Sequence, residues 1–320
     1  MSLRRPTATV TIDGRALTAP EAALVQLRVE LGLGSAHDRC VLRLQPLSPF
    51  ANVSTGAEVA VAVGYGDDPL DVFTGTVLSV ERSATGIAIE AIAASYALSL
   101  TRVAQAYVGQ TAADVANDLL SQAGVTVGEV EAPLALAAFH VDERRPAWSH
   151  LQRLARLAGA EIASAADGAV SLRPPKSGAA EHTLRHGAEL LAWSRLACAD
   201  GSPACEVVPF GAASEEGAAK WHLLLKEPDG GAPSAPTVVP GAIRDRDAAK
   251  AHAEALTAAV ARRTLAGTVL ATGDAEIRPG AIVELSGLPT GGDGDARVLA
   301  VVHHLDGGGF LTALRLGGVA

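Results

Sequence analysis

The sequence is poor in aromatic residues and cysteine, and it contains no long apolar run. Three Trp, three Tyr and five Phe occur among 320 residues, so Ala, Val, Leu and Ile must fill the cores. An aromatic platform for stacking nucleic-acid bases is therefore not expected. The three cysteines, Cys40, Cys198 and Cys205, are too few and too scattered for a disulfide framework or a zinc site. No stretch approaches the ~20 apolar residues of a membrane-spanning helix.

Positive charge is also scarce. The formal net charge is −9, and only four of the 26 basic residues are lysine. This balance argues against a phosphate-binding surface and against sequence-specific recognition of nucleic acid. The N-terminal Met-Ser-Leu-Arg-Arg-Pro has no apolar stretch behind its arginines, so no signal peptide is expected and the chain should be made in a reducing cytoplasm. Hydrophobic residues make up 48%, which is ample for packed cores in two or three domains.

The first hundred residues have the pattern of successive strands. Apolar residues alternate with polar ones in Val25–Leu31, and the same period of two recurs after each turn. The further segments with this pattern are 40–44, 59–63, 71–80 and 87–92. Strands about ten residues apart, joined by hairpin-type turns, predict a small antiparallel barrel or sandwich. A two-layer open sheet is the alternative.

The pattern becomes helical after Tyr96. Thr111 to Asp114 has the form of a capping box, apolar residues follow at helical spacing, and Gly124 stands where a helix ends. A second helix is predicted from Pro146, at the first helical position, to Gly159. The Asp167-Gly168 pair between 160–163 and 169–172 predicts a hairpin. Together these form a helix–helix–hairpin unit of about eighty residues.

From Pro174-Pro175 the chain returns to strands. A segment rich in Gly, Pro and Ser, 227–240, is expected to be a long loop, and Asp245 or Asp247 should cap a helix that runs to about Arg263. The strands predicted after this helix are 264–271, 281–285, 296–303 and 310–316. The order along the chain is thus β-rich, then α+β, then β-rich.

The most tempting chemical cluster is His303-His304 with Asp306, since two imidazoles and a carboxylate can hold a metal. Adjacent residues of a strand point to opposite faces, so one His should point inward and the other outward. His37-Asp38-Arg39-Cys40 contains residue types used in thiol catalysis, but a turn that leads into a strand does not place a base beside Cys40. Neither cluster predicts a site.

Other candidates are weaker still. Two Gly-x-Gly pairs lack the third glycine and the following helix of a dinucleotide loop, several carboxylates have no partner placed across a cleft, and one basic pair precedes a helix. These candidates are Gly32 and Gly34, Gly64 and Gly66, Glu161, Asp167 and Glu181, Glu189 and Glu206, Arg144-Arg145, and Cys198 with Cys205. No catalytic, cofactor-binding or metal-binding residue is assigned, and no cofactor is expected.

A family resemblance begins at 107–124, YVGQTAADVANDLLSQAG, and continues through Phe139-His140 and 146–159, PAWSHLQRLARLAG. It returns at 277–287, IRPGAIVELSG, at 296–303, ARVLAVVH, and at 309–312, GFLT. In this order and spacing the motifs resemble the phage late-control D family, the baseplate hubs of contractile phage tails and related injection systems. The resemblance covers about 200 residues and carries over no binding residue.

The resemblance implies a mainly β, α+β fold with two tube-like antiparallel β-barrel domains that flank an α+β insert domain. We place the first barrel domain at 1–100, the insert at 101–185, and the second barrel domain at 186–320 with a helix near 247–263. It also implies a homotrimer that adapts the hexameric inner tube to a trimeric spike. The partners are then the inner tube protein, other baseplate components and a spike, which we expect to be a separate polypeptide because no spike sequence follows Gly309-Phe310-Leu311-Thr312.

Three functions are compatible with these observations. The first is a structural hub that is not an enzyme and is incorporated into a phage tail or an injection-system particle. The second is a tube-capping or tail-completion protein, although such a protein needs only one barrel per chain. The third is a cell-wall hydrolase attached to the particle, which would require a cleft with coupled acid and base groups. The residues do not distinguish a phage from an extracellular or a membrane-anchored injection device.

Overall fold

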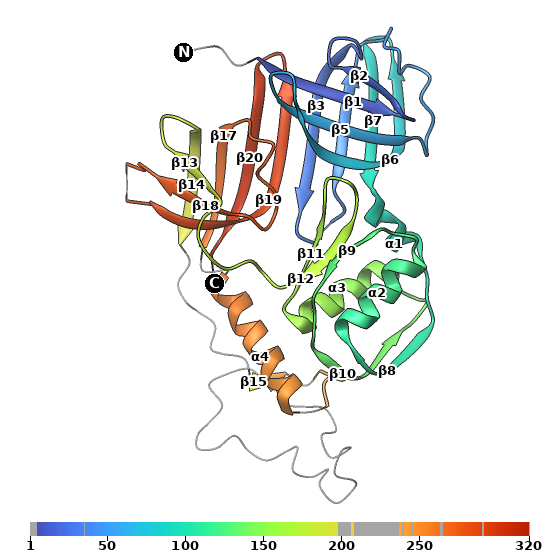
Figure 1. Cartoon of the computed structure of the whole chain (residues 1–320), viewed down its shortest axis with the longest axis vertical. Helices are drawn as coiled ribbons and strands as arrows, with labels where there is room; N and C mark the ends of the chain where they lie inside the picture. The colour runs from blue at the N-terminus through green and yellow to red at the C-terminus, as the bar shows by residue number, and fades with distance from the viewer. Residues whose placement is uncertain are drawn as a thin grey trace, which may run out of the picture.

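The computed structural model describes residues 5–34, 36–197, 206–207, 237–238, 240–244, 246–262, 265–289 and 291–319. Antiparallel strands dominate it, as the α+β, mainly β class predicts. Cys198, Cys205 and most of the predicted 227–240 loop lie outside the described residues. Figure 1 shows two groups of strands side by side, with a helical unit at one end of them.

The first group, the N-terminal β part, contains seven strands. Inward positions alternate with exposed ones in each, so that for example Leu27, Val29 and Leu31 are buried while Arg28 is exposed. The strands are β1 (Pro6–Ile12), β2 (Arg15–Thr18), β3 (Leu24–Gly32), β4 (Arg39–Leu44), β5 (Glu58–Tyr65), β6 (Leu70–Ser83) and β7 (Gly86–Ala93). The last five confirm the predicted segments.

The helical unit, called the insert below, contains both predicted helices and the predicted hairpin. Thr111 caps α2 with both bonds of the capping box, and Gly124 follows that helix at φ +66°. The prediction of Pro146 as the first helical residue is wrong, because its extended backbone (ψ 152°) makes it the N-cap residue. The elements are η1 (Ala94–Tyr96), α1 (Ala97–Leu100), β8 (Gln105–Thr111), α2 (Ala112–Gln122), β9 (Val127–Val130), β10 (Ala135–Val141), α3 (Ala147–Ala158), β11 (Glu161–Ser164) and β12 (Val170–Arg173).

The C-terminal β part follows the insert. Its elements are β13 (His182–Arg185), β14 (Leu190–Ala197), β15 (Glu206–Val207), β16 (Thr237–Val238), α4 (Arg246–Ala261), β17 (Leu265–Thr272), β18 (Ile282–Ser286), β19 (Gly294–Asp306) and β20 (Gly309–Gly317). The four predicted strands are confirmed. Asp247 lies in the first turn of α4 and is not its cap; the other candidate cap, Asp245, is outside the described residues.

The two β parts share one sheet. Among the described residues the strand order is β14-β17-β20-β19-β3-β4-β7-β6-β5-β1-β2, with β18 and β13 attached beside β19. The join is antiparallel and lies between β19 and β3, residues 300–305 against 27–32. No pairing among the described strands closes either part into a complete barrel, so the two predicted barrels take the form of two curved halves of one sheet.

Two separate hydrophobic clusters stabilise the chain. One runs from Ala8 to Ala93 and from Leu184 to Leu316, so that both β parts share it. The other fills the insert from Leu98 to Leu172 and includes Ala248 and Ala249 at the start of α4. Helix α4 therefore packs against the insert, and the buried His252 places Nδ1 2.8 Å from the carbonyl oxygen of Leu157 at the end of α3.

Candidate assembly surface

The two β parts repeat one arrangement of strands. The order β3-β4-β7-β6-β5 of the first part corresponds to β14-β17-β20-β19-β18 of the second. The register irregularities also correspond: β3 shifts against β4 between Leu24 and Gln26, and β14 shifts against β17 between Leu190 and Ala192. The long strands agree too, because β6 shifts at Leu78 and β19 at Leu299.

A matching pair of turns strengthens this correspondence. The N–H of Gly56 donates to Val77 O at 2.8 Å, and that of Gly280 donates to Val298 O at the same distance. Both glycines have positive φ, +87° and +92°, a conformation that L side chains rarely adopt. Each is followed by Ala and then by β5 or β18. Equal bulges and equal turns at equivalent places mean that the chain contains an internal structural duplication.

The join between the two parts is a packed strand pair. Between β19 and β3, His304 lies opposite Arg28 and Val302 lies opposite Glu30. These residues are on the face of the sheet that is turned away from the shared core, called the open face below. On the other face both strands contribute completely buried side chains, namely Val301 and His303 from β19 and Leu27 and Val29 from β3. The hydroxyl of Tyr65 also lies 3.5 Å from the carbonyl oxygen of Phe310 in the other part. The chain thus shows how one β part docks on another.

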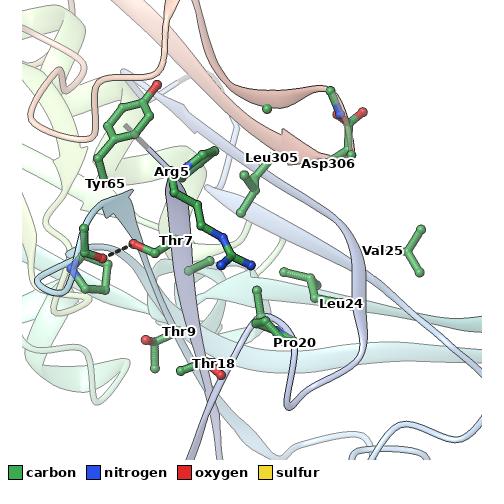
Figure 2. Close-up of a pocket in the computed structure, with 18 of the residues that line it drawn as sticks. Arg5, Thr7, Thr9, Thr18, Pro20, Leu24, Val25, Tyr65, Leu305 and Asp306 are labelled. Atoms are coloured by element: carbon green, nitrogen blue, oxygen red, sulfur yellow. Dashed lines mark hydrogen bonds between the residues drawn. The ribbon is translucent and has the colours of Figure 1, made fainter. Parts of the chain in front are cut away.

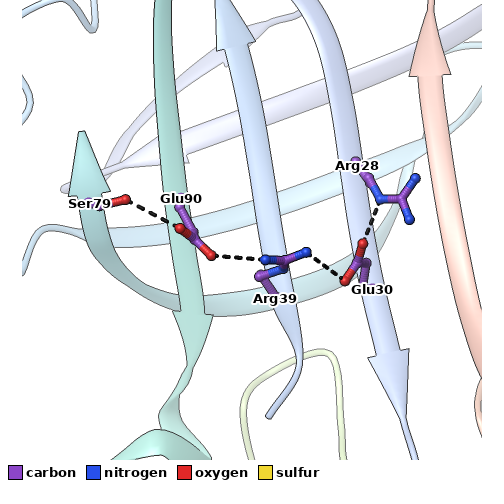
Figure 3. Close-up of polar contacts among 5 residues, drawn as sticks. All are labelled: Arg28, Glu30, Arg39, Ser79 and Glu90. Carbon is purple, nitrogen blue, oxygen red and sulfur yellow. Dashed lines mark hydrogen bonds and ion pairs between the residues drawn. The ribbon is translucent and has the colours of Figure 1, made fainter. Parts of the chain in front are cut away.

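The open face near the join carries alternating charges (Figure 3). The Arg28 Nε–Glu30 Oε1 distance is 2.6 Å, and Arg39 lies 3.0 Å from Glu30 and 3.2 Å from Glu90. Ser79 extends the row by donating to Glu90 at 3.3 Å. Exposed pairs of this kind add only ~0–1 kcal/mol each to stability. Their effect is to keep this face polar with its charges neutralised in pairs.

A partly buried arginine joins the insert to both β parts. Arg278 donates from Nη1 to Val72 O at 3.1 Å and from Nη2 to Ser164 O at 3.5 Å. The nearby carboxyl of Asp38 is 5% exposed and accepts the Gly32 N–H at 2.8 Å. Burial raises the pKa of Asp38 to about 7, although the Gly32 N–H and Arg278 act in the opposite direction. These contacts fix the mutual positions of β3, β6 and the β11–β12 hairpin.

A second arginine, which is almost completely buried, makes a further contact between the insert and the sheet. Arg297 of β19, 2% exposed, donates from Nη2 to Glu161 of β11. Burial raises the pKa of Glu161, and Arg297 opposes that shift. The Nε and Nη1 atoms of Arg297 are buried without a hydrogen-bond partner. The start of β11 in the insert is therefore bound to the C-terminal β part by an ion pair, and removing either residue of the pair would destabilise the fold by leaving the other charge uncompensated.

A groove of about 1360 Å³ lies where β1, the start of β3 and the β19–β20 turn approach one another (Figure 2). Its charged lining residues are Arg5, Asp67 and Asp306. Asp306 already accepts from the Gly308 N–H, with His304 Nε2 2.9 Å from its other oxygen. Thr7 at the rim donates to Gly66 O at 2.8 Å. Backbone atoms and these few polar side chains form the described lining, so the groove offers a surface for contact.

The histidine pair lies as predicted. His303 is buried, with Nδ1 3.1 Å from the Thr312 hydroxyl, and burial lowers its pKa to about 3, helped by the charge of Arg278. His304 faces the open side and contacts Asp306. The described part of the chain contains no cluster of three or more His, Cys, Asp or Glu residues that could hold a metal ion.

The turn before β4 is packed and structural. His37 lies between Ser95 Oγ, 2.9 Å from Nδ1, and Ser99 Oγ, 2.7 Å from Nε2, and its ring contacts Trp148. Burial lowers the pKa of His37 and raises that of the Cys40 thiol. His37 therefore connects the β3–β4 turn to the insert, while Cys40 is part of the sheet core.

The remaining candidate residues are scattered. Gly34 and Gly66 have positive φ in turns, as expected. The carboxylates are occupied locally: Glu181 pairs with Lys176, Asp167 caps its own turn, and Glu189 accepts the Arg185 N–H. Exposed Arg144 and Arg145 precede α3, and Glu206 lies in β15. Among the candidates that the structure describes, no two are brought together, and Glu161 pairs instead with Arg297. In the part of the chain that is described, no helix is long and apolar enough to cross a bilayer.

The edge-to-edge join of the two β parts was missed at the level of sequence, whereas their repetition was expected only as an implication of the family resemblance. A signal was present in Gly56-Ala57 and Gly280-Ala281, each followed by alternating apolar residues, but only the second copy resembles the family motif. The docking arrangement of β3 on β19 has no local signal. Within the described residues it shows how one β part can be joined to another.

Comparison with solved structures finds the same fold in phage tail proteins. The 43 kDa tail protein of prophage MuSo2 from Shewanella oneidensis has a TM-score of 0.70 at 13% identity, over 97% of this chain and 98% of that one. The tail protein from Neisseria meningitidis MC58 has a TM-score of 0.75 at 15% identity, over 98% and 97%. A type VI secretion component of Escherichia coli, described as similar to the T4 tail proteins gp27 and gp5, has 0.58 at 10%, over 92% and 73%.

Comparison at the level of sequence is less informative. A family model described as the Alg8 N-terminal domain matches residues 44–199, which is less than half of the chain. This match begins at the last residue of β4 and ends just beyond β14, so it cuts through both β parts. No curated protein matches this sequence. The comparisons thus establish that the chain has the fold of phage tail proteins.

Proposed function

We propose that this chain is the baseplate hub of a contractile phage tail or of a phage-tail-like injection system, as its resemblance to the late-control D family implies. In this function three copies form a ring that adapts a hexameric inner tube to a trimeric spike. The observation that carries the proposal is the internal duplication, in which two β parts with one strand order are joined edge to edge within a chain.

The physical reasoning concerns symmetry. Three chains, each with two similar β parts, present six similar units around one axis. A sixfold tube can then stack on one side of the ring, while the threefold relation between chains remains available to a spike on the other side. Such a ring is built from heterologous interfaces that close. The function requires complementary surfaces and no catalytic residue.

The partners of the proposed hub are its own two further copies, the inner tube protein, a spike protein and other baseplate components. Its place is inside a tail or injection particle assembled after synthesis in the cytoplasm. The fold that it shares with tail proteins supports this environment. The acidic net charge of −9 is consistent with a wall that does not retain passing nucleic acid.

Light scattering on the purified full chain tests the proposal. The expected result is a species with three times the protomer mass, seen as rings in electron micrographs and retained by the inner tube protein from the same gene cluster. A stable monomer at micromolar concentration that does not bind tube protein would overturn the hub. A hexamer would instead support the tube-capping alternative, and turnover of cell-wall fragments would support a hydrolase.

A further inference from the structure

The join inside the chain uses one edge of β19 and one edge of β3, and the equivalent edges of β6 and β14 are not paired with each other among the described strands. Strand β19 of the second part corresponds to β6 of the first, and β3 corresponds to β14. The C-terminal half of β19 pairs with β20 on one edge and with β3 on the other. In β6, residues 79–83 pair with β7 alone among the described strands, and β14 pairs with β17 alone. Among the described strands, β6 at these residues and β14 each therefore keep one edge without a paired neighbour.

Burial at these two edges differs from burial at the join. Val301 of β19 is 0% exposed beneath β3, whereas Val80, its counterpart in β6, is half-buried. Leu27 of β3 is likewise 0% exposed, whereas its counterpart Trp193 in β14 is half-buried. The same positions are thus covered where the chain supplies a neighbouring strand and uncovered where it does not. What covers them at the join is a β part of this same fold.

We infer that β14 of one copy adds as an antiparallel strand to residues 79–83 of β6 in the next copy, in the geometry that β3 and β19 have within a chain. The occupant of the open edge is therefore a second copy of this chain. This inference rests on the proposed trimeric function and specifies its interface. Three joins within chains and three between chains would then alternate around the ring.

The register follows from the correspondence of the two parts. The bulges at Leu78 and Leu299 align Ser83 with His304, and the bulges that follow Leu24 and Leu190 align Arg28 with Ser194. Because His304 lies opposite Arg28, Ser83 should lie opposite Ser194 of the neighbouring copy.

The same correspondence gives a second pair two residues away. Val302 lies opposite Glu30 at the join, which places Glu81 opposite Leu196 of the neighbouring copy. Directly opposed residues have Cα atoms about 4.5–5.5 Å apart, within the separation that a disulfide spans.

Two substitutions between the parts look unfavourable at first, because Arg82 takes the place of buried His303 and Arg195 that of buried Val29, so that two arginines stand opposite one another in this register. The Arg82 guanidinium turns away and donates to the carbonyl oxygens of Ala51 at 2.8 Å and Val53 at 2.7 Å. The charge of Arg82 is thereby hydrogen-bonded within the same copy and does not require a partner from the neighbouring strand. The edge of β6 therefore remains open to pairing.

Disulfide trapping tests this register. The full chain with Cys198→Ser and Cys205→Ser serves as the background, since Cys40 is completely buried. Ser83→Cys and Ser194→Cys are introduced together, and light scattering under reducing conditions establishes the oligomer before oxidation. The expected product is a ladder of covalent dimers and trimers on non-reducing gels. A second pair, Glu81→Cys with Leu196→Cys, should give the same ladder and guards against a local folding defect.

The matched control combines Ser79→Cys with Ser194→Cys. Ser79 is also an exposed serine of β6 on the open face, but it lies four residues, about 13 Å, from the required position, so it should not crosslink. The inferred interface is wrong if the chain is a trimer but neither in-register pair crosslinks it, or if the control pair crosslinks it equally well. Either result would leave the proposed hub function unaffected. A monomer under reducing conditions overturns the trimer itself, and the interface with it.

Discussion

The buried carboxyl of Asp38 should make stability depend on pH in an unusual direction. Its pKa of about 7 lies above the ordinary value of 3.8, because burial disfavours the ionised form. A raised carboxyl pKa stabilises the fold fully below about pH 4, and this contribution is lost as the pH rises through about 7. At 1.36 kcal/mol per pKa unit, the loss amounts to about 4 kcal/mol.

Replacing Asp38 by Asn removes the ionisation and keeps an oxygen that accepts the Gly32 N–H. The difference in unfolding free energy between the variant and the parent should therefore shift in favour of the variant by about 4 kcal/mol between pH 4 and pH 7. Urea unfolding of both proteins at several pH values measures this difference, and other titrating groups cancel in it.

Asp306→Asn is the control with the opposite sign. The His304 side chain and the Gly308 N–H lower the pKa of this exposed carboxyl, so its replacement should become less favourable as the pH rises. If the Asp38→Asn difference is the same at pH 4 and pH 7, then Asp38 ionises freely in the folded chain and the argument from burial is wrong.

Further substitutions probe three local features. Thr111→Ala removes the capping box of α2, with its 3.2 Å bond from the Asp114 N–H, and should cost about 1 kcal/mol in urea unfolding. Gly56→Ala and Gly280→Ala place a side chain at nearly equal positive φ, so both should cost a similar ~1–3 kcal/mol; very unequal losses would contradict the equivalence of the two turns. Glu161→Ala leaves Arg297 buried and unpaired, at a cost of about 3–5 kcal/mol. Glu161→Leu combined with Arg297→Met should unfold at a higher urea concentration than the single variant.

The local elements could largely be predicted because their signals are local. The strands of both β parts were predicted from the alternation of apolar and polar residues, and the ends of α2 from Thr111, Asp114 and Gly124. Even β1 had a signal, since Ala8, Val10 and Ile12 alternate with threonines and are buried. Steric limits of the backbone and amphipathic spacing act over a few residues, and the sequence displays them directly.

The structural role of the candidate residues was predictable only in part. Alternation along a strand was enough to separate His303 from His304. It could not reveal that His37 packs between two serines of the insert, or that Glu161 meets Arg297 of β19. Those contacts join segments that are distant along the chain, and they depend on how the insert is docked.

A mainly β chain with a helical unit between two β-rich stretches is predictable from local patterns, because periodicity and capping express the preferences of short segments. The common strand order of the two stretches, the continuation of the sheet from β19 into β3, and the unpaired edges of β6 and β14 among the described strands became visible only in three dimensions. Pairing between strands is set by the complementarity of whole edges and by the bulges that fix their register. Neither property can be read from one strand alone.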